Sequence, residues 1–563
     1  MIDNRYNATP TYDVVGPVRS GWEALAADVS ARDRVLAIDG PAALPWHDVV
    51  AFVAEALVKR GLATTHTDIR GFYRPWTEIE RMTATEALQD DPDFERLATA
   101  DLRDFFGELP VLHRDRDVIN IVFGPGAALV DHDTLWYMDQ PKRLAEATMS
   151  DGSGVNLGQP DDMAGSSRSL FYIDWPILDR HRDRLTGSID TWVDCQNPAG
   201  PSFVAFADLV EGLAQLAHRP FRTRSYFNST PWGGHWAQRQ LGINPDARNT
   251  AVGYELIAPE SGILLGQQAT HVEVPLQMMA ALTPDALLGS HVTPLFGTSF
   301  PIRFDYLDTV DGGPLSIHCH PQGEYMRKVF GWSYTQHETY YIMVGDESNT
   351  IFLGLSEESD PGRFRADVET AKRTGGSLDV ARHVQAHPAT EHQLFVIPAG
   401  TPHASGKGNV VLEISATPYL YSLRFYDWQR GADTPSGRPI HISHAFDNLD
   451  VLRSGDDVRA VLVPKPRLIG SGEGWLEYSL GTHTDLFYEV YRVHIEGEAS
   501  APATTDGRFH VINVVAGSDV VVTTGEGHHH RLTYAETMVI PAAVMDYTIT
   551  ASRDSMVVKA LVR

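Results

Sequence analysis

The segment from 312 to 345 carries the residues of this sequence that are best suited to hold a metal ion. Two histidines, His318 and His320, stand one residue apart, and two glutamates, Glu324 and Glu338, follow them. Because residues i and i+2 of an extended strand face the same side, both imidazoles would point to one place. An HxH pair alone is weak evidence, so the interpretation depends on further ligands that converge on the same point.

The structure expected after each glutamate decides between the two. ETYYIMVG, which starts at Glu338, is rich in β-branched and aromatic residues and ends in a glycine turn, as a strand commonly does. YMRKVF, which follows Glu324, has a basic pair in its middle and is more typical of a turn or a helical excursion. A strand that pairs back against the HxH strand brings its first residue beside the histidines, so we predict Glu338 as the ligand.

The same segment resembles the signature of the cupin family, whose fold is a β jelly roll. That signature, G(x)5HxH(x)3,4E(x)6G, is matched by Gly312, His318, His320, Glu324 and Gly331. The motif spacing therefore favours Glu324, whereas strand propensity favours Glu338. A second stretch, IPAGTPHASGKG, resembles the cupin element that carries a third histidine, here His403.

Three imidazoles and one carboxylate form the expected ligand set, which consists of His318, His320, Glu338 and His403. This set suits Zn²⁺ and also tolerates Mn²⁺, Co²⁺, Ni²⁺ or Fe²⁺. Open positions for a substrate oxygen would make such a site catalytic rather than structural. The HHH run at 528–530 follows GEG and is more typical of a surface turn.

Length and composition predict a multidomain globular protein. The chain has 563 residues, of which 43% are hydrophobic and 21% charged, with a formal net charge of −27. That charge argues against a nucleic-acid surface. No apolar run is long enough for a membrane helix, and the first residues lack the features of a signal peptide, so we expect a cytoplasmic protein. Two cysteines, Cys195 and Cys319, provide no disulfide framework, and strand alternation predicts that Cys319 packs away from the histidines.

Residues 1–222 alternate β-rich runs such as RVLAIDG with amphipathic stretches such as HDVVAFVAEALVKRG. This alternation predicts an α/β layer domain with a mostly parallel sheet, and its layout resembles a nucleoside kinase. A phosphate loop requires Gly, four residues, then Gly-Lys-Ser/Thr. Counted from Gly40, those places hold Pro45, Trp46 and His47. The P-loop is therefore degenerate, and we do not expect kinase chemistry.

Short alternating strands and frequent turns predict two cupin-like jelly-roll domains in the remainder. Residues 223–450 would form the metal-binding domain, with a helical insert, and residues 451–563 a second β-barrel. In that second barrel IPAAVMDY repeats the IPAGTPHA pattern, but Asp546 stands at the place of the histidine and no HxH precedes it. We therefore expect the C-terminal barrel to lack a metal.

The region from about 225 to the end resembles class I mannose-6-phosphate isomerases. Five stretches carry the resemblance in order: PWGG, FPIRFDYLDTVDGGPLSIHCHP, HETYYIMVGDESNTIFLGL, IPAGTPHASGKGNVVLEI and YSLRFYDWQRGADTPSGRPIHI. The resemblance implies a zinc-dependent aldose–ketose isomerase of carbohydrate metabolism. Its reaction would interconvert mannose 6-phosphate and fructose 6-phosphate by proton transfer through an enediolate.

The resemblance also implies roles for residues beyond the metal ligands. Glu413 in VVLEI would be the acid/base, Arg424 in SLRFYDW would face the open sugar, and Arg430 would be a further catalytic basic residue. The expected substrate-binding residues are Ser316, His337, Lys407 and Asp427. Without the resemblance, Glu413 also fits an ion-paired core carboxylate, and Arg424 with Asp427 fits a structural ion pair.

Two departures from the family pattern bear on the substrate. The family commonly has lysines that help to hold the sugar phosphate where Asp305 and Gln336 stand here. Because a carboxylate repels phosphate, an unphosphorylated or different sugar is the alternative substrate. A non-catalytic sugar sensor and an Fe²⁺-dependent cupin dioxygenase are alternatives of other classes. The oligomeric state stays open, with a homodimer among the options.

Overall fold

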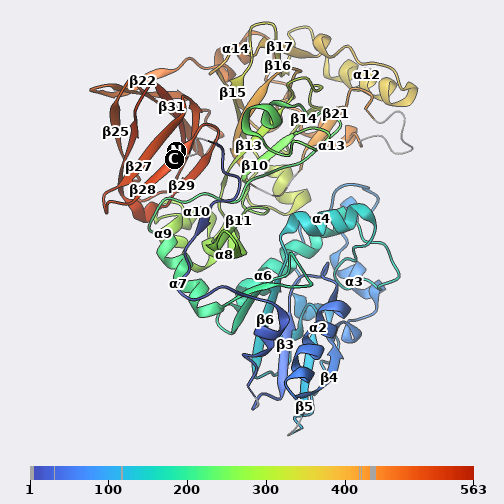
Figure 1. Ribbon diagram of the computed structural model, residues 1–563. Helices are drawn as coiled ribbons and strands as arrows, with labels where there is room; N and C mark the ends of the chain where they lie inside the picture. Colours follow the sequence, from blue (N-terminus) through green and yellow to red (C-terminus); the bar gives the residue numbers. More distant parts are fainter. Residues whose placement is uncertain (1–4, 31, 116–117, 418, 420, 431–438) are drawn as a thin grey trace.

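The computed structural model describes residues 5–30, 32–115, 118–417, 419, 421–430 and 439–563. Figure 1 shows an α/β part in blue and cyan, a central part in green to orange that is rich in strands, and a β part in red at the end of the chain. A mixed α/β and β organisation, as predicted, is confirmed. No helix in these described ranges is both long and apolar enough to cross a lipid bilayer.

The N-terminal part is built on one seven-stranded sheet. Its strands, in spatial order, are β2 (Arg19–Ser20), β8 (Ser202–Ala205), β7 (Thr191–Asp194), β6 (Thr134–Asp139), β3 (Val35–Asp39), β5 (Val118–Phe123) and β4 (Ala63–Asp68). The five strands from β7 to β4 are parallel, whereas β8 runs antiparallel to both of its neighbours, β7 and β2. The predicted mostly parallel sheet is therefore confirmed. Strand β3 is buried throughout, as expected of a parallel strand between two helical layers.

Helices complete this α/β part: α1 (Trp22–Ala26), α2 (Trp46–Lys59), α3 (Trp76–Thr83), α4 (Lys142–Asp151), α5 (Ser167–Ser169), α6 (Trp175–Leu185) and α7 (Phe206–Leu216). A π-helix, Leu170–Asp174, runs directly into α6. Strand β3 is followed by the turn at Gly40 and then by α2, in the order that the sequence predicts.

The Asp39 carboxylate occupies the backbone donors of both glycine turns beside β3. It accepts hydrogen bonds from the amides of Gly40 (2.7 Å), Gly126 (3.1 Å) and Ala128 (2.8 Å), and it lies 2.9 Å from Nε2 of His181. These amides are thus already bonded to an anionic side chain rather than left to cradle a phosphate. The likeness to a nucleoside kinase remains a prediction about layout.

The central part contains two facing sheets of antiparallel strands. One is ordered β18 (Leu394–Ile397), β15 (Glu338–Val344), β20 (Val410–Ala416), β13 (Ile302–Asp308), β10 (Val252–Leu256) and β9 (Tyr226–Phe227). The other is ordered β17 (Val384–Pro388), β16 (Thr350–Leu355), β19 (His403–Ser405), β14 (Ile317–Cys319) and β21 (Leu423–Tyr426). We call these two sheets the metal-binding sandwich, after the metal site that the sequence predicts in them. Cys319 is fully buried in its core, as expected.

Smaller elements surround this sandwich. Strands β11 (Gly262–Gln267) and β12 (Thr270–Pro275) form a hairpin, and β1 (Thr11–Tyr12) adds to it in parallel. The first described residues therefore pair with the central part rather than with the α/β sheet. The helices here are α8 (Leu276–Leu282), α9 (Pro284–Leu287), α10 (Thr293–Phe296), α11 (Gly323–Tyr325), α12 (Pro361–Thr374), α13 (Ile442–Asn448) and α14 (Asp456–Leu462).

The last part, the C-terminal sandwich, also has two sheets. One is ordered β22 (Arg467–Gly472), β23 (Trp475–Gly481), β24 (Tyr488–Ile495), β31 (Ser555–Val562), β26 (His510–Ala516) and β29 (Thr537–Ile540). The other is ordered β25 (Ala499–Thr504), β30 (Asp546–Ala551), β27 (Asp519–Thr524) and β28 (His529–Thr533). His528 and His529 are exposed where β27 turns into β28.

Candidate metal centre

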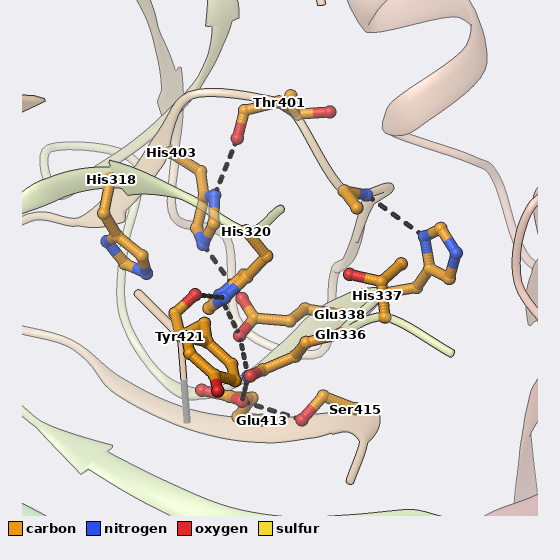
Figure 2. A network of polar contacts seen from close by, with 12 residues as sticks. His318, His320, Gln336, His337, Glu338, Thr401, His403, Glu413, Ser415 and Tyr421 are labelled. Atoms are coloured by element: carbon orange, nitrogen blue, oxygen red, sulfur yellow. Dashed lines mark hydrogen bonds and ion pairs between the residues drawn. The ribbon is translucent and has the colours of Figure 1, made fainter. Parts of the chain in front are cut away.

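The two facing sheets of the metal-binding sandwich bring the predicted metal ligands together. The strand that begins at Glu338 does not pair with the HxH strand, so that part of the prediction is wrong. His318 in β14 lies opposite His403 in β19, and His320 directly follows β14. Glu338 begins β15 in the facing sheet. One ligand atom from each of the four residues lies within 4.8 Å of the others, and all four residues are buried. Figure 2 shows the three rings grouped around the Glu338 carboxylate.

Each histidine ring is held through its Nδ1 atom by a backbone carbonyl. His318 Nδ1 lies 2.8 Å from Ser316 O, His320 Nδ1 lies 3.1 Å from Tyr421 O, and His403 Nδ1 lies 2.9 Å from Thr401 O. A ring that donates from Nδ1 keeps Nε2 as a lone-pair donor. The backbone thus orients all three imidazoles for coordination through Nε2.

The contacts around Glu338 fit a bound cation. Nε2 of His320 lies 2.7 Å from Oε1 and Nε2 of His403 lies 2.9 Å from Oε2 of this carboxylate. Neither contact has the alignment of a hydrogen bond, so both buried ring nitrogens and Oε2 are left without a hydrogen-bond partner. A divalent ion bound by these atoms would satisfy all of them.

Charge effects support the same assignment. Burial alone would raise the pKa of Glu338, but His320 and His403 outweigh it and hold that pKa well below its ordinary value. Burial lowers the pKa of His318 well below its ordinary value, and the neighbouring imidazoles lower it further. Neutral imidazoles and an ionised carboxylate are the forms that bind a metal.

Glu324 lies away from this cluster. It belongs to α11, which continues into the π-helix Met326–Phe330, so the predicted helical excursion after this glutamate is confirmed. Its side chain is exposed and pairs with Lys328 on the same helical face. The structure therefore groups Glu338, and not Glu324, with the histidines.

A second set of polar side chains lies beside the predicted metal ligands. These side chains are on the inner face of the sheet that contains β13, β15 and β20. Cross-strand pairing aligns Asp305 with Glu413 and Glu413 with Tyr340. Arg303 joins the two carboxylates, at 3.0 Å to Asp305 and 3.1 Å to Glu413. Gln336 donates to Glu338 at 2.5 Å and to Glu413 at 3.3 Å.

This arrangement leaves Glu413 poorly able to hold a negative charge. Burial raises the pKa of Glu413 well above its ordinary value; Arg303 opposes that rise, whereas Asp305 and Glu338 add to it. Ser415 donates to its Oε1 at 2.8 Å and fixes its position. A carboxyl group with a raised pKa beside a metal site is suited to proton transfer.

Both sets open onto one cavity of about 200 Å³. Its lining includes His318, Glu338, Gln336, Glu413, Arg303, Asp305, Ser316 and Arg424. Five carboxylates and two arginines line the whole cavity, the other carboxylates being Glu146 and Glu260. Acidic side chains therefore outnumber basic ones in the lining of this cavity.

The remaining predicted site residues lie outside this cavity. Strand alternation turns His337 away from Glu338, and its Nδ1 accepts from the amide of Ala399 at 3.1 Å. Lys407 is exposed on a turn beside a different surface hollow. Asp427 binds Arg430 at 2.5 Å and accepts from the hydroxyl of Ser316. Asp427, held by Arg430, thus fixes the position of the Ser316 hydroxyl.

Several cavity residues lie outside the motifs from which ligands or an acid/base were predicted. Glu146 and Phe171 come from the α/β part, and Trp232, Tyr254 and Glu260 come from segments before the HxH strand. None belongs to a motif with a metal-ligand or acid/base spacing. The packing of the α/β part on the metal-binding sandwich brings Glu146 and Phe171 to the cavity.

Comparison with known proteins gives one match to a family model and further matches to isomerases. Residues 21–218 match a family model described as Domain of unknown function (DUF8485). "Mannose-6-phosphate isomerase" of Streptococcus mutans serotype c is 24% identical over 337 residues, which are 58% of this chain and 94% of that protein. The crystal structure of the mannose 6-phosphate isomerase from Bacillus subtilis has a TM-score of 0.49 and 19% identity, over 61% of this chain and 99% of that one.

The chain is thus similar to an isomerase over almost the whole length of that relative. The prediction that it is an isomerase enzyme is confirmed at the level of enzyme class. The rest of this chain lies outside that alignment.

Proposed function

We propose that this protein is a metal-dependent aldose–ketose isomerase whose site is the cavity of the metal-binding sandwich. The proposal rests on one observation: a cluster of potential metal ligands and a possible acid/base lie next to each other at the same cavity. Three imidazoles and Glu338 converge on one point, and Glu413, a carboxyl group with a raised pKa, lies beside them. Moving a carbonyl between C1 and C2 requires a proton to leave a carbon next to the carbonyl and to return to its neighbour.

The metal would be held by His318, His320, Glu338 and His403, and when bound it would stabilise negative charge on the substrate oxygens. Glu413 takes the proton from one carbon and returns it to the adjacent carbon, while the hydroxyl proton moves from one substrate oxygen to the other. Arg303 and Ser415 fix the orientation of its carboxyl group. Gln336 bridges Glu338 and Glu413, which keeps the acid/base next to the ligand.

Arg424 supplies the remaining cation of the cavity. Its backbone amide pairs with His441, and its guanidinium donates to Pro439 O at 3.2 Å, which leaves other N–H groups for the substrate. A guanidinium is well suited to bind the hydroxyl and carbonyl oxygens of an open-chain sugar.

Two substrate classes follow from these observations. Mannose 6-phosphate is the substrate named for the relative from Streptococcus mutans. An unphosphorylated hexose is favoured by the charge of the cavity, because Arg303 is already paired with Asp305 and Glu413, and Gln336 carries no charge. A phosphorylated substrate would depend on Arg424 as its cation.

Turnover of matched substrates tests the proposal. Purified, zinc-loaded protein is offered mannose 6-phosphate, mannose, fructose 6-phosphate and fructose, with His403→Ala as the blank. Turnover of at least one pair by the unmodified protein, lost in the blank, is the expected result. Equal rates in both proteins on all four sugars would contradict the proposal.

A further inference from the structure

The cavity of the metal centre has one wall that belongs to the α/β part. Glu146, on α4, and Phe171, on the π-helix Leu170–Asp174, line it together with His318 and Glu338. Figure 1 shows α4 at the edge of the α/β part that faces the metal-binding sandwich. This wall belongs to residues 21–218, which match a separate family model.

Aromatic packing fixes this wall against the metal centre. Phe94 packs on Tyr421 with ring centroids 5.6 Å apart, and Tyr172 stacks on the same ring at 4.8 Å. The Tyr421 hydroxyl donates to Glu95 O at 2.8 Å, while the Tyr421 carbonyl accepts from the ring of His320. One residue therefore bonds to both the α/β part and a predicted metal ligand.

An ion pair anchors α4 itself. Arg143 binds Glu273 of β12 through both guanidinium nitrogens, each at 2.8 Å. The Glu273 side chain is 4% exposed and the Arg143 side chain 14% exposed. A buried bidentate pair of this kind restricts both partners to one geometry. Glu146, one helical turn along from Arg143, is thereby held in place at the cavity.

The chemistry of this wall suits hydroxyl groups and not a phosphate. Burial and the neighbouring Glu260 raise the pKa of Glu146 to about 8, and burial raises the pKa of Glu260 to about 7. Oε2 of Glu260 is buried and has no hydrogen-bond partner. Carboxyl groups near half-protonation both donate and accept hydrogen bonds, as sugar hydroxyls require.

The two basic residues whose charges lower the pKa values of these carboxyl groups, Lys142 and Arg303, are both already paired. Lys142, whose charge acts on both, is bound to Asp179 at 2.5 Å and lies within reach of Gln277. Arg303, which also acts on Glu260, is paired with Asp305 and Glu413. A phosphate placed at this end would meet unpaired carboxylates and cations that are already bonded.

We propose that Glu146 and Phe171 of the α/β part form a specificity wall that restricts the isomerase cavity to an uncharged, polyhydroxylated sugar. This inference rests on the proposed function. Glu146, with Glu260, binds hydroxyls at the end of the sugar and repels a phosphate group there. Phe171 contributes an apolar ring face that covers sugar C–H groups. The α/β part is thus a structural component of the active site.

Binding of non-reacting polyols tests this wall without turnover. Calorimetry on the zinc-loaded full chain, at a pH above 8 where Glu146 and Glu260 are mostly ionised, compares mannitol with mannitol 1-phosphate in the unmodified protein, Glu146→Gln, Phe171→Ala and Asp151→Asn. Asp151 is exposed on the same helix outside the cavity, so its variant controls for loss of one carboxylate.

We expect the unmodified protein to bind mannitol at least about tenfold more tightly than mannitol 1-phosphate. Glu146→Gln, which keeps size and hydrogen-bonding capacity, should reduce that ratio about tenfold, whereas Asp151→Asn should leave it unchanged. Phe171→Ala should weaken both polyols severalfold with little change in the ratio.

Tighter or equal binding of the phosphorylated polyol by the unmodified protein would overturn the proposal, as would failure of both polyols to bind. The same holds if Glu146→Gln and Asp151→Asn behave alike. Selective binding with no turnover of any sugar would instead refute the isomerase function and leave the wall in place.

Discussion

The metal-binding sandwich and the C-terminal sandwich share an architecture of two facing sheets but differ in what those sheets enclose. In the first, three histidines and several carboxylates face inward beside apolar residues. In the second, the inward positions are mostly Val, Ile and Ala, as in the core of β26, β27 and β31. The comparison teaches that the fold supplies positions and that individual side chains decide whether a site exists.

The related stretches IPAGTPHA and IPAAVMDY show where the two sandwiches diverge. His403 is fully buried and opposite His318, whereas Asp546, at the corresponding sequence place, is exposed at the start of β30. Gly400 turns with φ +84, while a helical turn, Ala542–Val544, takes this place in the second stretch. Because the two turns differ, the first residue of the following strand is buried in the metal-binding sandwich and exposed in the C-terminal sandwich.

Glu338→Gln should have the largest effect, because it removes the only carboxylate of the cluster. We expect metal affinity to fall at least about 100-fold and isomerase activity to fall with it. Elemental analysis after dialysis and turnover assays measure both. Glu324→Gln provides the matched comparison and should retain metal and activity; the reverse pattern would assign the site to the other glutamate.

Glu413→Gln should separate proton transfer from metal binding. We expect kcat to fall about 10²- to 10⁴-fold, with the metal content unchanged, because Glu413 is not among the four clustered ligand residues. The control is Glu477→Gln, which removes a carboxylate of the C-terminal sandwich that pairs with Lys559. A loss of metal in Glu413→Gln would contradict the assigned role.

Gly400→Ala should destabilise the fold more than a change at the corresponding turn of the C-terminal sandwich. An added Cβ would lie 2.6 Å from Asn448 O, and φ +84 disfavours any side chain, so we expect a loss of about 1–3 kcal/mol in the free energy of unfolding. Ala543→Gly should cost about 1 kcal/mol or less. Denaturant titration of both variants decides the order; equal losses would show that the two turns carry the same strain.

Much of the site could be predicted because it is encoded in local patterns. The HxH spacing, the strand that begins at Glu338 and the turn before His403 each specify a strand and a face, and the structure brings these residues together. The parallel sheet was likewise predictable from alternating strand and helix patterns. These features depend on residues that lie close together in the sequence, so one sequence is enough to predict them.

The remaining cavity residues depend on contacts between distant segments. Glu146 and Phe171 reach the cavity only because α4 and residues near Phe94 pack on the metal-binding sandwich. Lys407, in contrast, lies next to a motif but on an exposed turn. Sequence proximity to a motif does not determine on which side of a turn a side chain lies.

Asp546→His should have the smallest effect and is the sharpest test of the comparison. The sequence pattern suggests that a histidine here would restore the missing ligand. In the structure Asp546 is exposed and pairs through its backbone with Thr504, and the buried His510 is already bonded to Tyr547 at 2.8 Å. We expect no additional bound metal and a stability change within about 0.5 kcal/mol. A second metal equivalent, measured by elemental analysis, would show that ligand identity alone separates the two sandwiches; an unchanged content would show that the direction of the strand's first residue separates them as well.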